Sequence, residues 1–290
     1  MKLRLLVLSI ALSLPVSLMA QGLDTGKMDE VMGRSGQKTG DVYRFGFPRT
    51  DLHVAVAGVE LKPGLALGSW AAFTGNDNAA MVMGDLVLLE NELAPVMKKL
   101  RAAGFEITAV HNHLLNETPR VVYMHYMGRG KAVELSKALH AALAESKTPL
   151  DKPAPPAPNS ESPAFVKTVE DILGTQGKFG GGVLSFGISR AEAITDHEMT
   201  LSTPQGVAEA INFQEAGAGK VATTGDFVLT AGEVNPVISA LEEHDIAVTA
   251  LHSHMLAEQP RLFFMHFWAV GSPESVAAGI KAALSHIAKK

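Results

Sequence analysis

The sequence predicts an α+β protein made of two tandem copies of one β-rich domain, each with two to three helices. The first observation is an internal repeat, because the motif that begins at His111 recurs in the same order and spacing from His252. The second is the local pattern. Segments of strand length in which apolar residues alternate are separated by a few segments in which apolar residues recur at helical spacing. The third is the size of each copy, about 120 residues, which is close to the usual size of one domain.

The helices are expected at equivalent places in both copies. Each copy should open with a short helix, at residues 27–32 and 165–173, because Gly33 and Gly174 follow as C-terminal caps. Asn91 should cap a second helix, in which apolar residues between 93 and 100 recur at helical spacing. Residues 131–144 should form the last helix of the first copy.

The strands are predicted from alternating apolar residues. Asp85 and Asp226 each follow a glycine within such a run. A glycine there usually marks a bulge or a turn, and each aspartate could support the ligands of a nearby site. The run around Met124 and His125, like its second copy, is apolar on both faces and indicates a central, doubly covered strand. The expected strands of the first copy are 42–47, 53–60, 68–73, 80–89, 105–113 and 120–127.

Residues 1–20 are typical of a signal peptide, with a basic start, an apolar run and Ala20 at the expected cleavage point. The two repeat domains should then occupy residues 21–146 and 164–290. Prolines are concentrated in residues 147–163, which predicts a semi-rigid, extended linker between the domains. The mature protein is expected to be periplasmic or secreted, without stable membrane insertion.

The composition excludes several classes of function. The chain contains no cysteine, so disulfides, thiolate nucleophiles and cysteine zinc sites are ruled out. Its formal net charge of −5 gives no reason to expect binding to nucleic acid or to an anionic membrane. No phosphate-binding loop or dinucleotide fingerprint is present.

Histidines form the chemically distinctive part of the repeat. His111 and His113 are two residues apart on a predicted strand, so their side chains should point to the same face, as should those of His252 and His254. His125 lies on the next strand, and His266 is its equivalent. Pairing of His111 with His125 would place both on one face, whereas a slip of one residue would place Met124 there.

Imidazoles at this spacing predict a divalent-metal site for zinc, iron, copper or manganese. The predicted ligands are His111, His113, His125, His252, His254 and His266. Glu117 and Glu258 are predicted as a further ligand or the general base. The alternative is structural: these histidines could satisfy hydrogen bonds within a packed sheet, with each glutamate paired to a nearby arginine.

Arg120 and Arg261 follow a proline in each copy of the motif. An arginine there can clamp the carboxylate or phosphate of a substrate. It can also pair with the glutamate of the same motif, Glu117 or Glu258, and the sequence leaves both interpretations open.

The strings at residues 250–256 (ALHSHML) and 258–268 (EQPRLFFMHFW) resemble the LppY/LpqO family. Residues 69–73, 83–88 and 224–229 extend the resemblance over nearly all of the mature chain. That family is a domain of unknown function in exported bacterial proteins and is named after mycobacterial lipoproteins. The resemblance implies export but no settled activity, and the absence of cysteine departs from the lipid-anchored members.

Two functions from different classes follow. The first is an exported metal-dependent protein, a hydrolase or an oxidoreductase. The second is a non-enzymatic binding or scaffold protein, in which a groove between the paired repeats takes an unidentified small-molecule ligand. The two copies are expected to pack against each other within the chain. Their motifs could then form one composite site or two separate sites.

Overall fold

The computed structural model describes residues 22–151, 162–197 and 199–289. The predicted signal peptide and most of the proline-rich linker therefore lie outside the described residues. The described start of the linker follows the first repeat, where Arg34 Nη2 donates hydrogen bonds to the carbonyl oxygens of Pro149 (2.7 Å) and Asp151 (2.6 Å).

The two repeats contain the same succession of main elements, as the internal repeat predicts. The first consists of α1 (Thr25–Met32), β1 (Gln37–Thr39), β2 (Val42–Pro48), β3 (Ala55–Val56), β4 (Val59–Glu60), α2 (Pro63–Ala66), β5 (Gly68–Asn76), β6 (Ala79–Leu89), α3 (Glu90–Ala102), β7 (Glu106–His111), β8 (Val121–Gly130) and α4 (Ala132–Leu143). The second consists of α5 (Ala164–Leu173), β9 (Lys178–Gly180), β10 (Val183–Ser189), β11 (Ile194–Asp196), β12 (Met199–Leu201), the 3-10 helix η1 (Thr203–Gln205), β13 (Ala208–Gly217), β14 (Lys220–Leu229), α6 (Val234–Glu242), β15 (Ala247–His252), β16 (Glu258–Gln259), β17 (Phe263–Gly271) and α7 (Pro273–Leu284).

Each repeat builds one six-stranded antiparallel sheet. The strand order is β1-β2-β5-β6-β8-β7 in the first repeat and β9-β10-β13-β14-β17-β15 in the second. These orders match strand for strand, so the protein is a duplicated α+β fold, as predicted. The strands that carry the Met-His pairs, β8 and β17, lie one strand in from the edge of each sheet.

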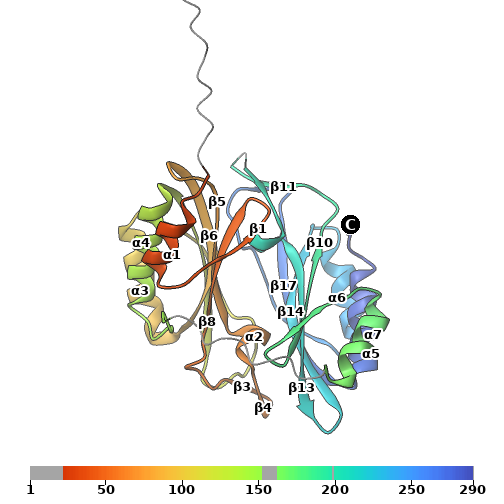
Figure 1. The fold of residues 1–290 in the computed structure, drawn as a ribbon. Coiled ribbons are helices and arrows are strands. Elements are labelled where there is room, and N and C mark those ends of the chain that lie inside the picture. Colours follow the sequence, from red (N-terminus) through yellow and green to blue (C-terminus); the bar gives the residue numbers. More distant parts are fainter. Residues whose placement is uncertain (1–21, 152–161, 198, 290) are drawn as a thin grey trace, which may run out of the picture.

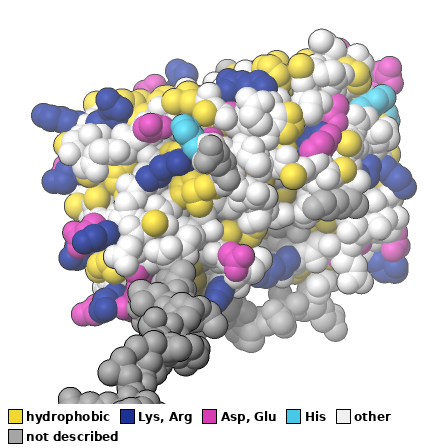
Figure 2. Space-filling view, turned by 90° about the horizontal axis from the view of Figure 1, so that it is seen from above, with side chains coloured by type: hydrophobic (Ala, Val, Ile, Leu, Met, Phe, Trp, Pro, Cys, Tyr) yellow, Lys and Arg dark blue, Asp and Glu magenta, His cyan; other side chains and the backbone are white. Residues whose placement is uncertain are grey.

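The molecule has four layers, with the sheets facing each other and the helices on the outside (Figure 1). Successive strand residues alternate between the two faces of their sheet. On β6, Val82 and Leu86 pack in the cluster beneath the outer helices, whereas Met83 and Val87 pack in clusters between the sheets. On the face shown in Figure 2, acidic and basic side chains are interspersed rather than gathered by sign.

The space between the sheets is closed by apolar clusters that mix residues of both repeats. In one cluster Val183 of the second repeat packs with Leu65 and Val87 of the first. In the other, Met83 of the first repeat packs with Phe264 of the second. The two repeats therefore share buried surface, in addition to the cores under their own helices.

Side chains of one repeat also hydrogen-bond the backbone of the other. Gln214 accepts a hydrogen bond from the backbone N–H of Lys62 (2.8 Å) and donates one to the carbonyl of Glu60 (2.8 Å). Asn112, next to the histidine motif, donates to the carbonyl of Thr249 at 3.3 Å. These contacts fix how the two sheets face each other and thereby position the histidines that lie between them.

Several local predictions are confirmed and others are wrong. Gly33 and Gly174 adopt the left-handed conformation at the C-termini of α1 and α5, as expected of C-terminal caps. Asn91 does not cap α3. That helix begins at Glu90, and the side chain of Glu92 accepts the hydrogen bond of the Leu89 N–H at 2.8 Å.

Two of the strand predictions also need correction. The strand expected at residues 53–60 is a short hairpin of β3 and β4, because Ala57 and Gly58 turn the chain with positive φ angles of 49° and 82°. Gly84 and Asp85 form neither a bulge nor a turn. They lie inside β6, which pairs with β8 in unbroken register from Ala80 to Leu89.

In each repeat a buried arginine follows the second strand of the sheet, β2 or β10, and pairs with nearby carboxylates. Arg49 is fully buried and forms ion pairs with Glu92 (2.8 Å) and Asp51 (2.9 Å). Arg190 forms the equivalent pairs with Glu233 (2.9 Å) and Glu192 (3.0 Å). Because each guanidinium is buried, loss of a paired carboxylate would leave an uncompensated charge inside the protein.

The second repeat carries an additional buried carboxyl, Glu209. Its Oε2 accepts a hydrogen bond from the Val228 N–H at 2.6 Å, whereas its Oε1 is buried without a partner and lies 3.9 Å from Arg190. In the first repeat Ser69 accepts the equivalent hydrogen bond, from the Val87 N–H at 2.8 Å. Burial raises the pKa of Glu209 from 4.5 to about 8.

Glu209→Gln is therefore expected to stabilise the protein at pH 8. A carboxyl whose pKa is higher in the folded state stabilises fully below pH 4.5, and this contribution is lost as pH rises through 8. The loss is on the order of a few kcal/mol. The difference in melting temperature between pH 5 and pH 8 should be smaller for Glu209→Gln than for the unsubstituted protein. An equal difference would contradict the prediction, and Glu215→Gln, at an exposed residue, is the control.

Candidate metal centre

The strand register places two histidines of each repeat on one face. The strand predicted to reach His113 ends at His111, so His113 lies beyond β7, and His254 in the same way lies beyond β15. His111 at the end of β7 is opposite Tyr123, and Ala109 is opposite His125 on β8. Directly paired residues share a face, as do residues two apart, so His111 and His125 both point into the space between the sheets. Met124 points the other way, into the core beneath the helices. The second repeat has the same register, with Ala250 opposite His266.

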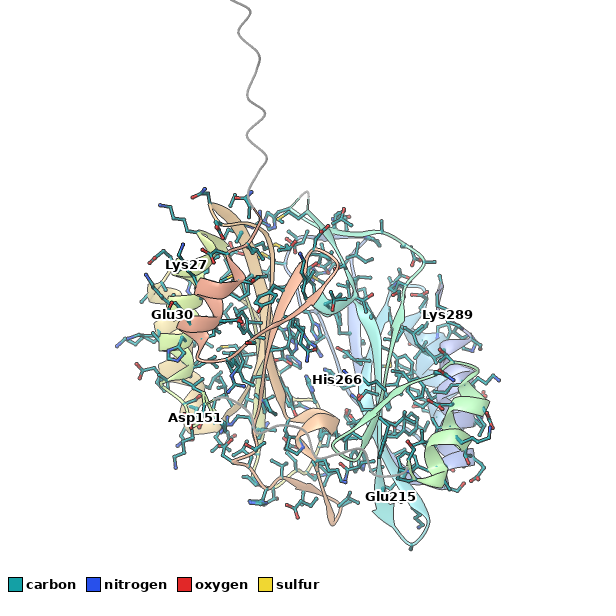
Figure 3. All side chains as sticks on the ribbon, viewed as in Figure 1. Lys27, Glu30, Asp151, Glu215, His266 and Lys289 are labelled. Carbon is teal, nitrogen blue, oxygen red and sulfur yellow. The ribbon has the colours of Figure 1, made fainter. Side chains whose placement is uncertain are left out.

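The histidines of the two repeats meet between the sheets, where Figure 3 labels His266. The arrangement has pseudo-twofold symmetry, because each contact has its equivalent and His111 stacks on its own counterpart. The ring centroids are 3.6 Å apart for His111 and His252, 3.7 Å for His113 and His266, and 3.7 Å for His125 and His254. We call these six residues the histidine cluster.

Buried ring nitrogens without hydrogen-bond partners distinguish this cluster. A buried polar atom without a partner costs free energy, and most such atoms in proteins are paired. In all six side chains Nε2 is buried and has no hydrogen-bond partner among the described residues, and the same holds for Nδ1 of His111. These nitrogens therefore lack the hydrogen bonds that the structural alternative requires of them, and they are available to a ligand.

Subsets of the cluster are close enough to hold a metal ion. His111, His252, His254 and His266 form one group, and His111, His113 and His125 form another. Within each group the ligand atoms lie within 4.8 Å of one another. Imidazole nitrogen is a common ligand for zinc, copper and iron, so the donor set fits such an ion.

Backbone carbonyls orient the histidines of the central strands. His266 Nδ1 lies 2.8 Å from the carbonyl oxygen of Gly225, which can only accept, so Nδ1 carries the proton. His125 also has a backbone hydrogen bond with Gly84. Donation from Nδ1 leaves a lone pair on Nε2, and this is the usual way in which proteins fix a metal-binding imidazole.

Two aspartates lie beside the cluster on the neighbouring strands. Asp85 on β6 has oxygens 3.8 Å from Nε2 of both His113 and His125. Asp226 on β14 lies 3.5 Å from His254 Nε2. These separations exceed a good hydrogen bond and are close to the roughly 3.4 Å between two donors of one tetrahedral zinc ion. Burial raises the pKa of Asp85 to about 7 and that of Asp226 well above its usual value.

Burial has the opposite effect on the histidines, because it disfavours the charged imidazolium. It lowers the pKa of His252 to about 4 and that of His266 to about 3. The pKa values of His111, His113 and His125 are also lowered by burial, and the charges of neighbouring histidines add to the effect. Neutral imidazoles are the form that binds metal, so the cluster is ready for an ion at neutral pH.

The glutamates of the motif are placed differently from the histidines. Glu258 on β16 accepts hydrogen bonds from the Leu262 N–H (3.1 Å) and from Arg261 (3.2 Å), which is the pairing that the structural alternative predicts. Glu117 is buried in the segment between β7 and β8. Neither belongs to the groups close enough to share an ion. Their role as general base stays a prediction.

The arginines of the motif contact acidic or hydroxyl side chains near them. Arg120 is largely exposed and lies 3.7 Å from Glu90. Arg261 donates to Glu258 and to the hydroxyl of Ser253, at 3.2 and 3.1 Å. Their binding of a substrate anion stays a prediction.

A cavity of about 700 Å³ leads to the cluster between the two sheets. Four histidines and both aspartates line it, together with the side chains of Trp70 and Arg44. The guanidinium of Arg44 lies over the Trp70 ring, 4.7 Å from its centroid. Neither residue is recognisable as a site residue from the sequence, because neither belongs to the repeated motif: Ser185 occupies the place of Arg44 in the second repeat.

The glycines before the two aspartates are required by close strand packing. A Cβ at Gly225 would overlap the carbonyl oxygen of Ala210 on β13, and a Cβ at Gly84 would overlap that of Trp70 on β5. These obstacles are backbone atoms, which cannot move without displacing a strand. The Gly-Asp pair of each repeat therefore allows the carboxyl to be placed beside the histidines.

We expect Gly225→Ala to destabilise the protein by about 1–3 kcal/mol, the usual cost of overpacking a core. Urea unfolding measures the change. Gly187→Ala is the matched control, because a Cβ there would have its nearest neighbour at 3.9 Å. Equal stability of the two variants would contradict the prediction.

The fold and the site define a duplicated α+β protein with a histidine cluster enclosed between its two repeats. The chain belongs to the family described as "Domain of Unknown Function (DUF1259)", whose model matches residues 26–145 and 167–286. A search of curated proteins found no match. None of the helices in the described residues is long and apolar enough to cross a membrane.

Solved structures give only distant similarity. The trimeric bacterial microcompartment shell protein PduB is 10% identical, with 87% of this chain and 89% of that chain covered and a TM-score of 0.22. EtuB from Clostridium kluyveri is 11% identical, with coverages of 86% and 90% and a TM-score of 0.20. At such TM-scores these likenesses carry no argument about fold or function.

Proposed function

We propose that this protein binds a divalent transition metal in the histidine cluster and acts on a small molecule there. The observation that carries the proposal is the set of six buried imidazoles, drawn equally from both repeats, whose Nε2 atoms have no hydrogen-bond partner in the part of the chain that the structure describes. Backbone carbonyls orient two of these rings so that Nε2 faces the cluster. Six nitrogen donors favour zinc, copper or iron over manganese, which prefers oxygen ligands.

The cavity supports a catalytic role in addition to metal binding. It reaches four of the histidines, so a water molecule and a small substrate could approach a bound ion. An ion of this kind lowers the pKa of bound water or polarises a substrate carbonyl, which would serve a hydrolase. Bound copper or iron would instead serve an oxidoreductase. We therefore propose a metal-dependent hydrolase or oxidoreductase.

Asp85 is well placed to move a proton in such a reaction. It lines the cavity, lies 3.8 Å from two histidines and has a pKa raised to about 7. A carboxyl with that pKa can both accept and donate a proton near neutral pH. We therefore assign this role to Asp85 and to its equivalent Asp226, in addition to the predicted Glu117 and Glu258.

Elemental analysis of protein purified without a histidine tag tests the proposal. We expect stoichiometric metal in the unsubstituted protein and its loss in the double variant His252→Ala, His254→Ala, which removes two of four ligands from one group. The control is His53→Ala, His286→Ala, two exposed histidines outside the cluster. Metal below stoichiometry, unchanged by the double substitution, would overturn the proposal.

The second candidate is a ligand-binding protein without catalysis. It is favoured by the cavity between the repeats and by Arg44, which lines the cavity and is stacked on Trp70. A guanidinium held in this way suits a small carboxylate or phosphate. Acetate, citrate and phosphate are expected to raise the melting temperature, and Arg44→Ala should remove this effect. Stabilisation by metal alone would contradict this candidate.

We also propose that the protein is exported, with residues 1–20 removed, and that it is an LppY/LpqO protein within its family. The support is the pattern of those residues and the strings that resemble this family. The mass of the protein recovered from the periplasm and the culture medium tests the export. A full-length chain confined to the cytoplasm would exclude it.

A further inference from the structure

One histidine differs from the other five in its environment. His111 alone belongs to both groups that could hold an ion within the described residues. It is also the member of the cluster with both ring nitrogens buried and unpartnered. An imidazole has two nitrogens on opposite sides of its ring, and after loss of the ring proton each can bind a metal ion.

Its pseudo-twofold equivalent lacks this property. His252 stacks on His111 with ring centroids 3.6 Å apart, but its Nδ1 lies 3.4 Å from the carbonyl oxygen of Ser253. This carbonyl can only accept, so it favours a proton on Nδ1 and leaves Nε2 as the single metal-binding nitrogen. The two central histidines are therefore equivalent in position and different in what they can bind.

We propose that the cluster holds two metal ions bridged by the ring of His111. One ion is bound by His111 with His252, His254 and His266, and the other by His111 with His113 and His125. The ring proton of His111 passes to solvent when the second ion binds. The inference rests on the proposed metal binding, and it adds the number of ions and the residue that joins them.

Asp85 and Asp226 agree with two ions rather than one. Each carboxyl lies beside a different half of the cluster: Asp85 beside His113 and His125, and Asp226 beside His254 and His266. Two dications surrounded only by neutral imidazoles would repel each other strongly. One carboxylate near each ion and a negatively charged bridge reduce this repulsion.

Copper(II) loading of the whole metal-free protein tests the bridge. Unbound copper is removed by desalting, copper per chain is measured by elemental analysis, and unpaired spins are counted by electron paramagnetic resonance. We expect two copper ions per chain and far fewer spins than copper ions, because a bridging imidazolate couples neighbouring copper(II) spins. His111→Gln should restore one spin per bound copper.

His252→Gln is the matched comparison: it removes one of the four ligands proposed for the first ion, but leaves the other three and the bridging residue His111. It should keep the deficit of spins. If His252→Gln restores the spins and His111→Gln does not, the bridge is assigned to the wrong residue. The copper content and spin count of the unsubstituted protein decide whether a bridged pair of ions forms, even if a variant fails to fold.

The outcomes also separate the two proposals. If the unsubstituted protein retains no copper, and zinc, iron and cobalt give the same result, both the proposed function and the bridge fail. One copper per chain with its full spin supports metal binding and overturns the bridge. Two copper ions with their full spins overturn the bridge as well, because the ions are then independent.

Discussion

Residues 21–146 and 164–290, produced as separate proteins, are not expected to remain stable monomers. Each half would expose to water the face of its sheet that the other half covers in the whole chain. In the first half this face carries Met81, Met83 and Met127, and in the second it carries Val228 and Phe264, all buried between the sheets. An exposed apolar patch of this kind promotes association or aggregation.

Light scattering after size-exclusion chromatography, combined with thermal melts, measures the effect. Each half should be dimeric or aggregated, or should melt well below the whole chain. Mixed in equal amounts, the halves should form a 1:1 complex that regains metal binding, because the larger metal group takes residues from both. Halves that are monomeric, and as stable as the intact protein, would show that the packing between the sheets contributes little.

The sequence predicts most of the local structure because local patterns determine it. The internal repeat implies two similar domains, and both sheets have the same strand order. Glycines at the ends of α1 and α5 are recognisable as caps, since the left-handed conformation favours glycine. The hairpin at residues 53–60 is missed because its turn begins at a non-glycine residue, Ala57, with a positive φ of 49°, which the sequence does not reveal.

The composition of the cluster could be predicted in part. His111 and His113 are two residues apart, which predicts that both rings lie on one side of a strand. However, β7 ends at His111, so strand geometry does not determine where the ring of His113 lies. The position of His125 depends on how β7 pairs with β8, which a bulge between Ile107 and Ala109 shifts. Sequence spacing does not reveal such a shift.

The contacts between the repeats could not be predicted. His113 meets His266 and His125 meets His254 only because the two sheets face each other with one particular relative orientation. That orientation depends on surface complementarity and on side-chain contacts such as that of Gln214 with Glu60, which no periodicity encodes. The sequence also predicts a bulge or turn at Asp85, because the glycine before it usually interrupts a strand.

The metal-free protein is expected to lose stability as the pH falls below 6.5. Burial lowers the pKa of His252 to about 4 and that of His266 to about 3, from 6.5. Below 6.5 the unfolded chain therefore binds protons that the folded cluster excludes, and protonation favours unfolding. For His252 alone the effect down to pH 4 is on the order of a few kcal/mol.

Buried carboxyls act in the opposite direction in the same pH range. The pKa of Asp85 is raised to about 7, so the stability that this group contributes is present below pH 3.8 and is lost as pH rises through 7. Asp226 and Glu209 act in the same direction as Asp85. All six histidines of the cluster have lowered pKa values, and they outnumber these carboxyls. The net effect of acid should therefore be destabilising.

Urea unfolding of chelator-treated protein between pH 4 and pH 7 measures this dependence. The double variant His252→Gln, His266→Gln removes two of the responsible groups and leaves the carboxyls, so its stability should fall less steeply with acid. His53→Gln, at a histidine whose side chain is 84% exposed, should behave like the unsubstituted protein. Bound metal should make the free energy of unfolding depend less on pH near neutrality. It should be released at lower pH, because protons and metal ions compete for the same nitrogens. An equally steep curve for the double variant would show that acid acts on other parts of the protein.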